Sequence, residues 1–203
     1  MKYLSCAETA KLVRQALKEA FPRVNFSVRS KRYSGGASIS VRWTDGPNDA
    51  QVSAITSGFA GAYFDGSIDY QGSVYHMLQG KQVSFGADFI FTTRDDSEAA
   101  VERAIGHVYR KFEGNFGNSC VPRPTVKAYV MGELWSVRLP GLHDWNGQNL
   151  QTEIGAVIAK HTFTPKVGKS ATALSVFVTH DDGYSKTSGS GMSAVNVDSG
   201  DDE

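Results

Sequence analysis

Residues 26–47 read FSVRSKRYSGGASISVRWTDGP, with apolar and polar side chains alternating on both sides of a glycine pair. The alternating apolar positions are Val24, Phe26 and Val28 before the pair, and Ile39, Val41 and Trp43 after it. A period of two is typical of strands that bury one face. The pattern therefore predicts a β-hairpin, in which residues 30–37 form a loop longer than the tightest turns.

The glycine pair raises the question of a phosphate-binding loop. A Walker loop needs GxxxxGK[ST] between a strand and a helix. Gly35 and Gly36 lack the following Gly-Lys-Ser/Thr and lead into a strand, and no dinucleotide fingerprint GxGxxG occurs there. Nucleotide hydrolysis is therefore disfavoured at this place.

Helices are expected on both sides of the hairpin. Ser5 and Glu8 have the spacing of a capping box, and helical periodicity then predicts a helix over residues 6–20. After the hairpin, Pro47 suits the start of a second helix that reaches about residue 59.

Further elements follow along the chain. The clearest later strand is 83–91, and the acidic residues at 95–98 favour the start of a helix that ends near 112. Beyond a stretch rich in Gly, Asn and Pro we expect short strands at 127–131 and 135–139, a helix near 150–158, and a last strand at 173–178.

This order predicts an α+β fold, with an α-β-β-α-β-β-α core in which helices pack on one face of an antiparallel sheet. We expect a domain over 1–112 and a smaller α/β extension over 113–180. Residues 181–203 are acidic and rich in Ser and Gly, so they are predicted to be a disordered tail.

Composition excludes several classes of protein. The chain has 203 residues, of which 40% are hydrophobic and 21% charged, and no apolar run approaches the length of a membrane helix. The N-terminus lacks the apolar segment of a signal peptide, so a cytoplasmic site of action without a membrane partner is expected. Cys6 and Cys120 are too few for a disulfide framework or a zinc module.

No catalytic, metal-binding or cofactor-binding residue is predicted. The five histidines are scattered and form no HExxH or HxH motif. Asp65 and Asp69 could converge as a carboxylate pair in a metal-dependent nuclease, although turn roles are commoner for aspartates in such a loop.

The net charge of zero hides an uneven distribution. Residues 1–43 hold nine Lys and Arg against Glu8 and Glu19, a formal charge of +7. Residues 181–203 hold six acids against Lys186, a formal charge of −5. The acidic tail could keep the protein soluble, compete with the basic part, or mimic a nucleic acid.

The basic residues form the candidate binding site. Strand parity points Arg29 and Arg42 away from the apolar residues, and Tyr33 could stack on a base. The complete candidate set is Lys11, Arg14, Lys18, Arg29, Lys31, Arg32, Tyr33 and Arg42. Three interpretations stay open for this surface: it binds the backbone of DNA or RNA, it binds an acidic protein, or it is only solvated.

Three segments in this order resemble the large polyvalent protein-associated domain 29: FSVRSKRYSGGASISVRWTDGP (26–47), FDGSIDY (64–70) and GADFIFTTR (86–94). The resemblance covers about residues 8–112. Such domains occur in phage and conjugative-element proteins thought to counter host defences. The family carries no established catalytic residues, so none is transferred to this chain.

The resemblance implies a non-enzymatic accessory protein of a phage or plasmid that acts in the bacterial host cell. We expect it to bind nucleic acid or a host complex that targets nucleic acid. One alternative is an inhibitor of a CRISPR or restriction complex that makes protein contacts only. Another is the metal-dependent nuclease that would use Asp65 and Asp69. The oligomeric state stays open.

Overall fold

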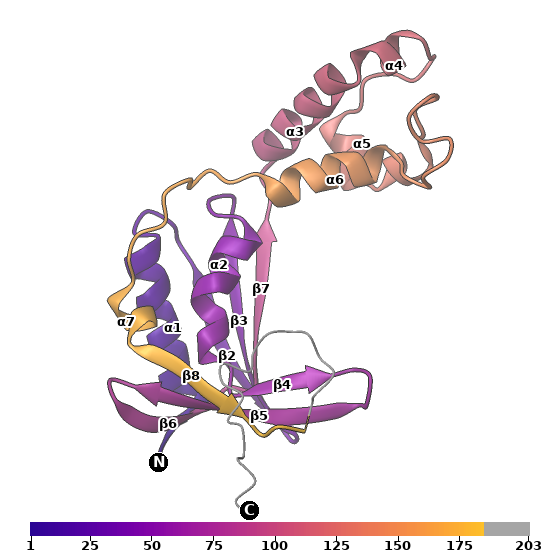
Figure 1. Ribbon diagram of the computed structural model, residues 1–203. Coiled ribbons are helices and arrows are strands. Elements are labelled where there is room, and N and C mark those ends of the chain that lie inside the picture. Colours follow the sequence, from indigo (N-terminus) through magenta and orange to yellow (C-terminus); the bar gives the residue numbers. More distant parts are fainter. Residues whose placement is uncertain (185–203) are drawn as a thin grey trace, which may run out of the picture. The chain divides into compact units, whose positions relative to one another are not determined.

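The computed structural model describes residues 1–184, which form two compact units (Figure 1). Unit 1 contains residues 1–43 and 49–93 together with 166–184 of the described chain. Unit 2 contains residues 44–48 and 94–165. Residues 94–112 therefore belong to unit 2, and the chain returns to unit 1 after residue 165. The predicted domain boundaries at 112 and 180 stay predictions.

Unit 1 contains a three-stranded sheet in the order β2-β3-β7. Its strands are β2 (Ser27–Tyr33), β3 (Gly36–Thr44) and β7 (Phe89–Asp95). Strands β2 and β3 pair antiparallel, from Ser27 opposite Arg42 to Tyr33 opposite Gly36. The turn is therefore only Ser34 and Gly35, and the predicted long loop is wrong. The polar residues at 30–33 suggested a loop, but polar side chains that point to the solvent do not interrupt strand pairing.

Strand β7 runs parallel to β3. The Asp88 N–H donates to the Ala37 carbonyl at 2.8 Å, and further along the Asp45 N–H donates to the Asp95 carbonyl at 2.9 Å. The Asp88 carboxylate also accepts from the Ala37 N–H at 2.8 Å. A Cβ on Gly36 would lie 2.0 Å from that carboxylate, so the glycine allows β7 to approach the hairpin.

A second sheet has five strands. They are β1 (Lys2–Ser5), β4 (Ala62–Asp65), β5 (Tyr70–Leu78), β6 (Lys81–Gly86) and β8 (Val176–Asp181). Strand β1 pairs parallel with β6, whereas β4, β6 and β8 all pair antiparallel with β5. The α+β class is confirmed, but the strands form two sheets with parallel pairs in place of one antiparallel sheet. The single strand expected at 83–91 divides at Ala87 and Asp88 into β6 and β7, because the chain passes there from one sheet to the other.

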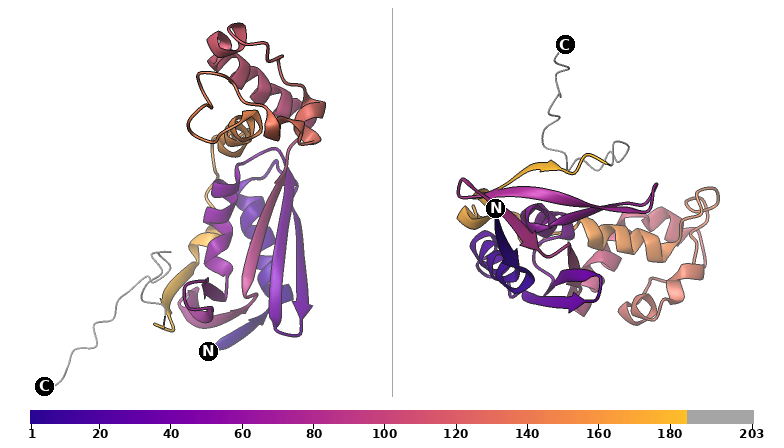
Figure 2. Two further views of the ribbon diagram at one scale, coloured as in Figure 1. Left: turned by 90° about the vertical axis from the view of Figure 1, so that its right-hand side faces the viewer. Right: turned by 90° about the horizontal axis from the view of Figure 1, so that it is seen from below.

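Two helices cover one face of the three-stranded sheet (Figures 1 and 2). They are α1 (Cys6–Ala20) and α2 (Asp49–Thr56), the latter followed by the 3-10 turn η1 (Ser57–Phe59). The predicted capping box of α1 is present, with Ser5 and Glu8 bonding reciprocally. Val13 and Leu17 of α1 are fully buried with Ile39 and Val41 of β3 in one apolar core.

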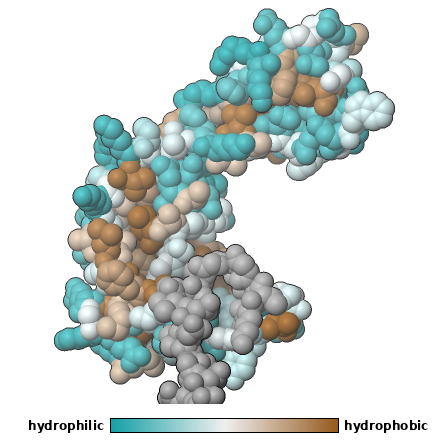
Figure 3. All heavy atoms as spheres, viewed as in Figure 1, coloured by the Kyte–Doolittle hydropathy of each residue, from teal (hydrophilic) through white to brown (hydrophobic). Residues whose placement is uncertain are grey.

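The last described segment is fastened to the rest of unit 1. It contains α7 (Ala171–Leu174) and β8. Glu19 of α1 accepts hydrogen bonds from the Thr172 N–H at 2.9 Å and the Ser170 hydroxyl at 2.8 Å. The Thr172 N–H is the largest influence that lowers the Glu19 pKa to about 2. Hydrophobic side chains gather over α1 and α7 on this side of unit 1 (Figure 3).

Near the end of the described chain, Asp182 is hydrogen-bonded to strands β4 and β5. Its carboxylate accepts from the Tyr63 hydroxyl at 2.6 Å, the Tyr70 hydroxyl at 2.8 Å and the Ser73 N–H at 2.8 Å. The expectation of disorder from residue 181 is therefore wrong for 181–184. The remainder of the predicted tail, 185–203, and the three interpretations of its charge lie outside the described residues.

Unit 2 is helical apart from the ends of β3 and β7. Its elements are α3 (Glu98–Lys111), α4 (Glu113–Gly117), α5 (Val126–Val130), the 3-10 turn η2 (Glu133–Ser136) and α6 (Leu150–Lys160). The predicted strands at 127–131 and 135–139 are wrong. Thr125 caps α5 and Gly132, at φ 72°, ends it, so two short helical turns replace the expected strands. The part of the expected α/β extension that lies in unit 2, residues 113–165, thus contains helices and no strand, and β8 near the end of the extension belongs to unit 1. Unit 2 has a separate core, which includes Ile105, Leu139 and Ile154.

Among residues 1–184, no helix combines the length and the apolar character needed to span a bilayer.

Candidate nucleic-acid interface

The three-stranded sheet leaves one face bare within unit 1. Ile90 packs into the core and the Thr92 hydroxyl lies 3.3 Å from the Ser53 hydroxyl of α2, so these two β7 residues point toward the helices. Their neighbours Phe89 and Phe91 therefore point to the opposite side. No described helix or strand of unit 1 covers that side (Figure 2, left). We call it the outer face, formed by Ser27, Arg29, Lys31, Tyr33, Ser38, Ser40, Arg42, Phe89, Phe91 and Thr93.

Three cations lie on the outer face and form no ion pair within the described residues. The register places Arg29 opposite Ser40, Lys31 opposite Ser38, and Arg42 opposite Ser27. All three cations are exposed. Because each long side chain faces a small hydroxyl across the strands, the positive charge is free to meet a ligand.

Aromatic rings stand beside these cations. The ring centroids of Phe89 and Phe91 are 6.2 Å apart, and Phe91 is 56% exposed. Tyr33, the last residue of β2, is 47% exposed. Exposed rings next to unpaired cations match the two parts of a single-strand-binding surface, a stacking platform and a basic track.

The predicted site residues divide into two groups. Arg29, Lys31, Tyr33 and Arg42 come together on the outer face. Arg32 follows the opposite parity, and its charge acts on the buried thiol of Cys6, whose pKa is raised mainly by burial.

The cations of α1 lie away from the outer face, since α1 packs on the covered side of the sheet. The Arg14 guanidinium donates to the Val28 carbonyl of β2 at 2.8 Å. Lys11 and Lys18 are exposed on the same helix. The helix thus contributes a separate basic surface.

Sequence reasoning missed Phe89 and Phe91. In GADFIFTTR these residues alternate with Ile90 and Thr92, which is the pattern of a strand with both faces in use. Reading 83–91 as one strand hid the pattern, because parity could not be carried across the break at Ala87.

Asp65 and Asp69 serve a turn. The Asp65 carboxylate accepts from the Ser67 N–H at 2.9 Å and from its hydroxyl at 2.6 Å. Asp69 has φ 50° between β4 and β5. Across the described residues, no group of three or more His, Cys, Asp or Glu side chains could hold a metal ion.

Two histidines are fully buried. Burial lowers the pKa of His76 to about 4, so its imidazole is neutral at physiological pH. His143 in unit 2 accepts a hydrogen bond from the Leu139 N–H at 3.0 Å through Nδ1. Both side chains belong to the interior of their units.

The fold and the outer face define an α+β domain with a basic, aromatic sheet face. The model of one family, the large polyvalent protein associated domain 29, matches residues 4–104. Residues 4–104 are therefore a domain of this family; they contain α1, α2 and the whole three-stranded sheet, and the resemblance seen in the sequence is confirmed. Such domains are typical of the large polyvalent proteins of mobile elements. A search of curated proteins and a search of solved structures each found no match.

Proposed function

We propose that the protein is a non-enzymatic accessory protein of a mobile element that binds single-stranded DNA or RNA on the outer face. The observation that carries the proposal is the grouping of three unpaired cations with the exposed ring of Phe91 and the half-buried ring of Phe89 on one bare sheet face. Phosphates need the cations and unstacked bases need the rings.

The order of the strands suits a single strand of nucleic acid. Arg29 and Lys31 lie on β2, Arg42 on the central β3, and Phe89 and Phe91 on β7. Neighbouring strands are about 4.8 Å apart, so rings and cations are separated by about 10 Å or less across the sheet. The phosphate backbone would follow β2 and β3 while bases turn toward β7. A duplex keeps its base faces stacked and would use only the cations.

A counter-defence role rests on this binding and on the family. A mobile-element protein that covers single strands would hide entering nucleic acid from host complexes that target it, or occupy the nucleic acid of such a complex. The same surface supports a second candidate, contact with an acidic protein of a CRISPR or restriction complex. That candidate is favoured by the position of β2 at the edge of its sheet. A strand of a partner protein can pair with an edge strand, and here it would meet the side chains of Arg29 and Lys31.

Salt-dependent anisotropy of labelled short oligonucleotides tests the proposal. Single-stranded DNA or RNA should bind more tightly than a duplex of the same sequence, and binding should weaken as salt rises. The triple variant R29Q/K31Q/R42Q should lose most of this binding. The matched control K11Q/K18Q/R32Q removes the same charge away from the outer face and should retain it.

The outcomes separate the candidates. Equal loss in both triple variants would show attraction by net charge alone and contradict the proposed surface. If no oligonucleotide binds at low salt, nucleic-acid binding fails as the function. Capture of a defence complex by R29Q/K31Q/R42Q as well as by the wild type would then favour protein contact elsewhere.

A further inference from the structure

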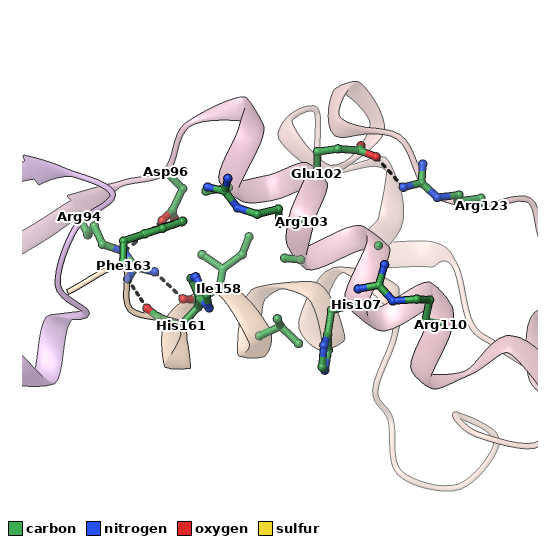
Figure 4. A pocket seen from close by; sticks show the side chains of 14 residues that line it. Arg94, Asp96, Glu102, Arg103, His107, Arg110, Arg123, Ile158, His161 and Phe163 are labelled. Carbon is green, nitrogen blue, oxygen red and sulfur yellow. Dashed lines mark hydrogen bonds and ion pairs between the residues drawn. The ribbon is translucent and has the colours of Figure 1, made fainter. Parts of the chain in front are cut away.

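Unit 2 contains a cavity of about 430 Å³ between α3 and α6, wholly lined by residues of that unit (Figure 4). The volume lies in the range of small-molecule sites. Its lining combines apolar side chains with four arginines, two carboxylates and two histidines. With both histidines neutral, the lining carries a formal charge of +2, so an anionic ligand suits it.

Two of the arginines are already partnered. Arg94 forms an ion pair with Asp96 at 3.0 Å and donates to the carbonyls of His161 and Ile158. These bonds fasten the end of α6 to the end of β7, so Arg94 has a structural role. Arg123 forms an ion pair with Glu102 at 2.5 Å.

The surplus charge lies along α3. Arg103, His107 and Arg110 follow the spacing i, i+4, i+7 and share one face of the helix. Figure 4 shows these side chains along the cavity, with the Arg123–Glu102 pair nearby. Arg103 and Arg110 form no ion pair within the described chain.

Two guanidinium groups converge over Gly106. A Cβ at this glycine would lie 3.6 Å from Arg110 Nη1 and 3.9 Å from Arg123 Nη2. Glu102 can neutralise only one of the two positive charges. Like charges held together favour an anion between them, and paired guanidinium groups match the oxygens of a phosphate. The missing side chain at Gly106 leaves room for that phosphate.

The other end of the cavity offers a flat surface. The Arg103 guanidinium lies over the Phe163 ring at 4.5 Å, and His161 meets the same ring edge-on at 4.5 Å. Arg103 is exposed, so the face of its guanidinium turned away from Phe163 can receive a planar ring. Guanidinium planes and aromatic rings are the groups on which bases stack.

We propose that this cavity binds a nucleoside phosphate, with the phosphate between Arg110 and Arg123 and the base stacked on Arg103. The ligand is either a free nucleotide or the phosphorylated end of a nucleic-acid chain. The inference goes beyond the proposed function, because it uses other residues in another unit and does not depend on the outer face.

Calorimetric titration of the full chain with AMP, ADP, adenosine and inorganic phosphate tests the inference. We expect AMP or ADP to bind more tightly than adenosine or phosphate. R110Q should weaken nucleotide binding by about tenfold to a hundredfold, because a charged hydrogen bond is lost. The matched control K111Q changes the next residue of α3, which lies outside the cavity, and should bind as the wild type. Unchanged thermal unfolding of R110Q would show that the loss is local.

The source of the ligand needs a second comparison. A 5′-phosphorylated dinucleotide that binds more tightly than both AMP and its 5′-hydroxyl form would identify a chain end, and tighter binding of AMP would identify a free nucleotide. The outer-face variant R29Q/K31Q/R42Q should bind nucleotide normally, so failure here and failure of the proposed function are distinguishable. Absence of nucleotide binding, equal binding by R110Q, or adenosine binding as tightly as AMP would overturn the inference.

Discussion

The two faces of the sheet β2-β3-β7 are built from alternate residues of the same strands, yet they have different chemistry. The covered face carries Ile39 and Val41, which are fully buried under α1. The outer face carries Arg29 and Lys31 on β2 and the exposed ring of Phe91 on β7. The covered face accounts for folding, so the unusual content of the outer face needs another explanation, and we assign it to binding.

A simpler explanation covers only part of the outer face. Edge strands often carry cations because these prevent pairing with another chain. That accounts for Arg29 and Lys31 on the edge strand β2. It does not account for Arg42, which lies on the central strand. Nor does it account for the exposed Phe91 on the other edge strand, where a charged residue would protect better against pairing with another chain. The predictions below test whether the two faces are in fact separate in their roles.

The largest effect is expected from the covered face. Ile39→Ala should lower the free energy of unfolding by about 2–5 kcal/mol, because the side chain is fully buried and its loss leaves a cavity. Urea unfolding measures the change. Ser40→Ala, at the next residue but on the outer face, should change it by about 0.5 kcal/mol or less. Similar values for both variants would contradict the assignment of the faces.

The next effect concerns binding. Phe91→Ala should weaken single-strand binding by about fivefold to 150-fold, since a base stacked on an aromatic ring contributes about 1–3 kcal/mol. Its stability should change little because the ring is 56% exposed. Phe177→Ala is the matched control, because that ring is 61% exposed on the other sheet. Equal weakening in both variants would remove the stacking role.

Much of the covered face could be predicted from the sequence, because local signals decided it. The capping box at Ser5 fixed the start of α1, and the alternation around Val41 identified the hairpin. The parallel pairing of β3 with β7 could not be predicted. It depends on contacts between residues far apart in the chain, such as Asp88 with Ala37.

The outer face was predicted only in part for the same reason. Parity within the hairpin placed Arg29 and Arg42 correctly on one side. The phenylalanines come from β7, and nothing local in the sequence shows which sheet β7 joins. Unit 2 was harder still, since the short apolar runs around 127–139 fit strands and helical turns equally well.

Glu19 of α1, in the layer over the covered face, makes the stability of the protein depend on pH. Glu19 has a folded-state pKa of about 2 against its usual 4.5, so its ionised form stabilises the fold. This stabilisation is complete above pH 4.5 and is lost as the pH falls toward 2. Glu19→Gln should therefore lower the unfolding temperature at neutral pH and approach the wild type near pH 2. The effect should be smaller than that of Ile39→Ala, because solvent screens the carboxylate.

If the two faces have separate roles, the substitution at Glu19 should not affect binding on the outer face. Nucleic-acid binding by Glu19→Gln should equal that of the wild type at neutral pH, where both are folded. A parallel loss of binding would mean that the layer over the covered face controls the outer face, and the two faces could not be treated separately.

The smallest effect is expected from single cations and resolves the hairpin itself. Arg29 and Arg32 are three residues apart on β2 and therefore have opposite parity. Arg29→Gln should reduce the slope of log affinity against log salt for single-stranded DNA by about 0.7, the value for one phosphate contact. Arg32→Gln should leave the slope unchanged, although it removes the same charge from the same strand. Equal reductions would mean that the strand acts as a basic rod without a preferred face. A reduction confined to Arg29→Gln would show that strand parity, and not charge alone, selects the surface that meets the phosphates.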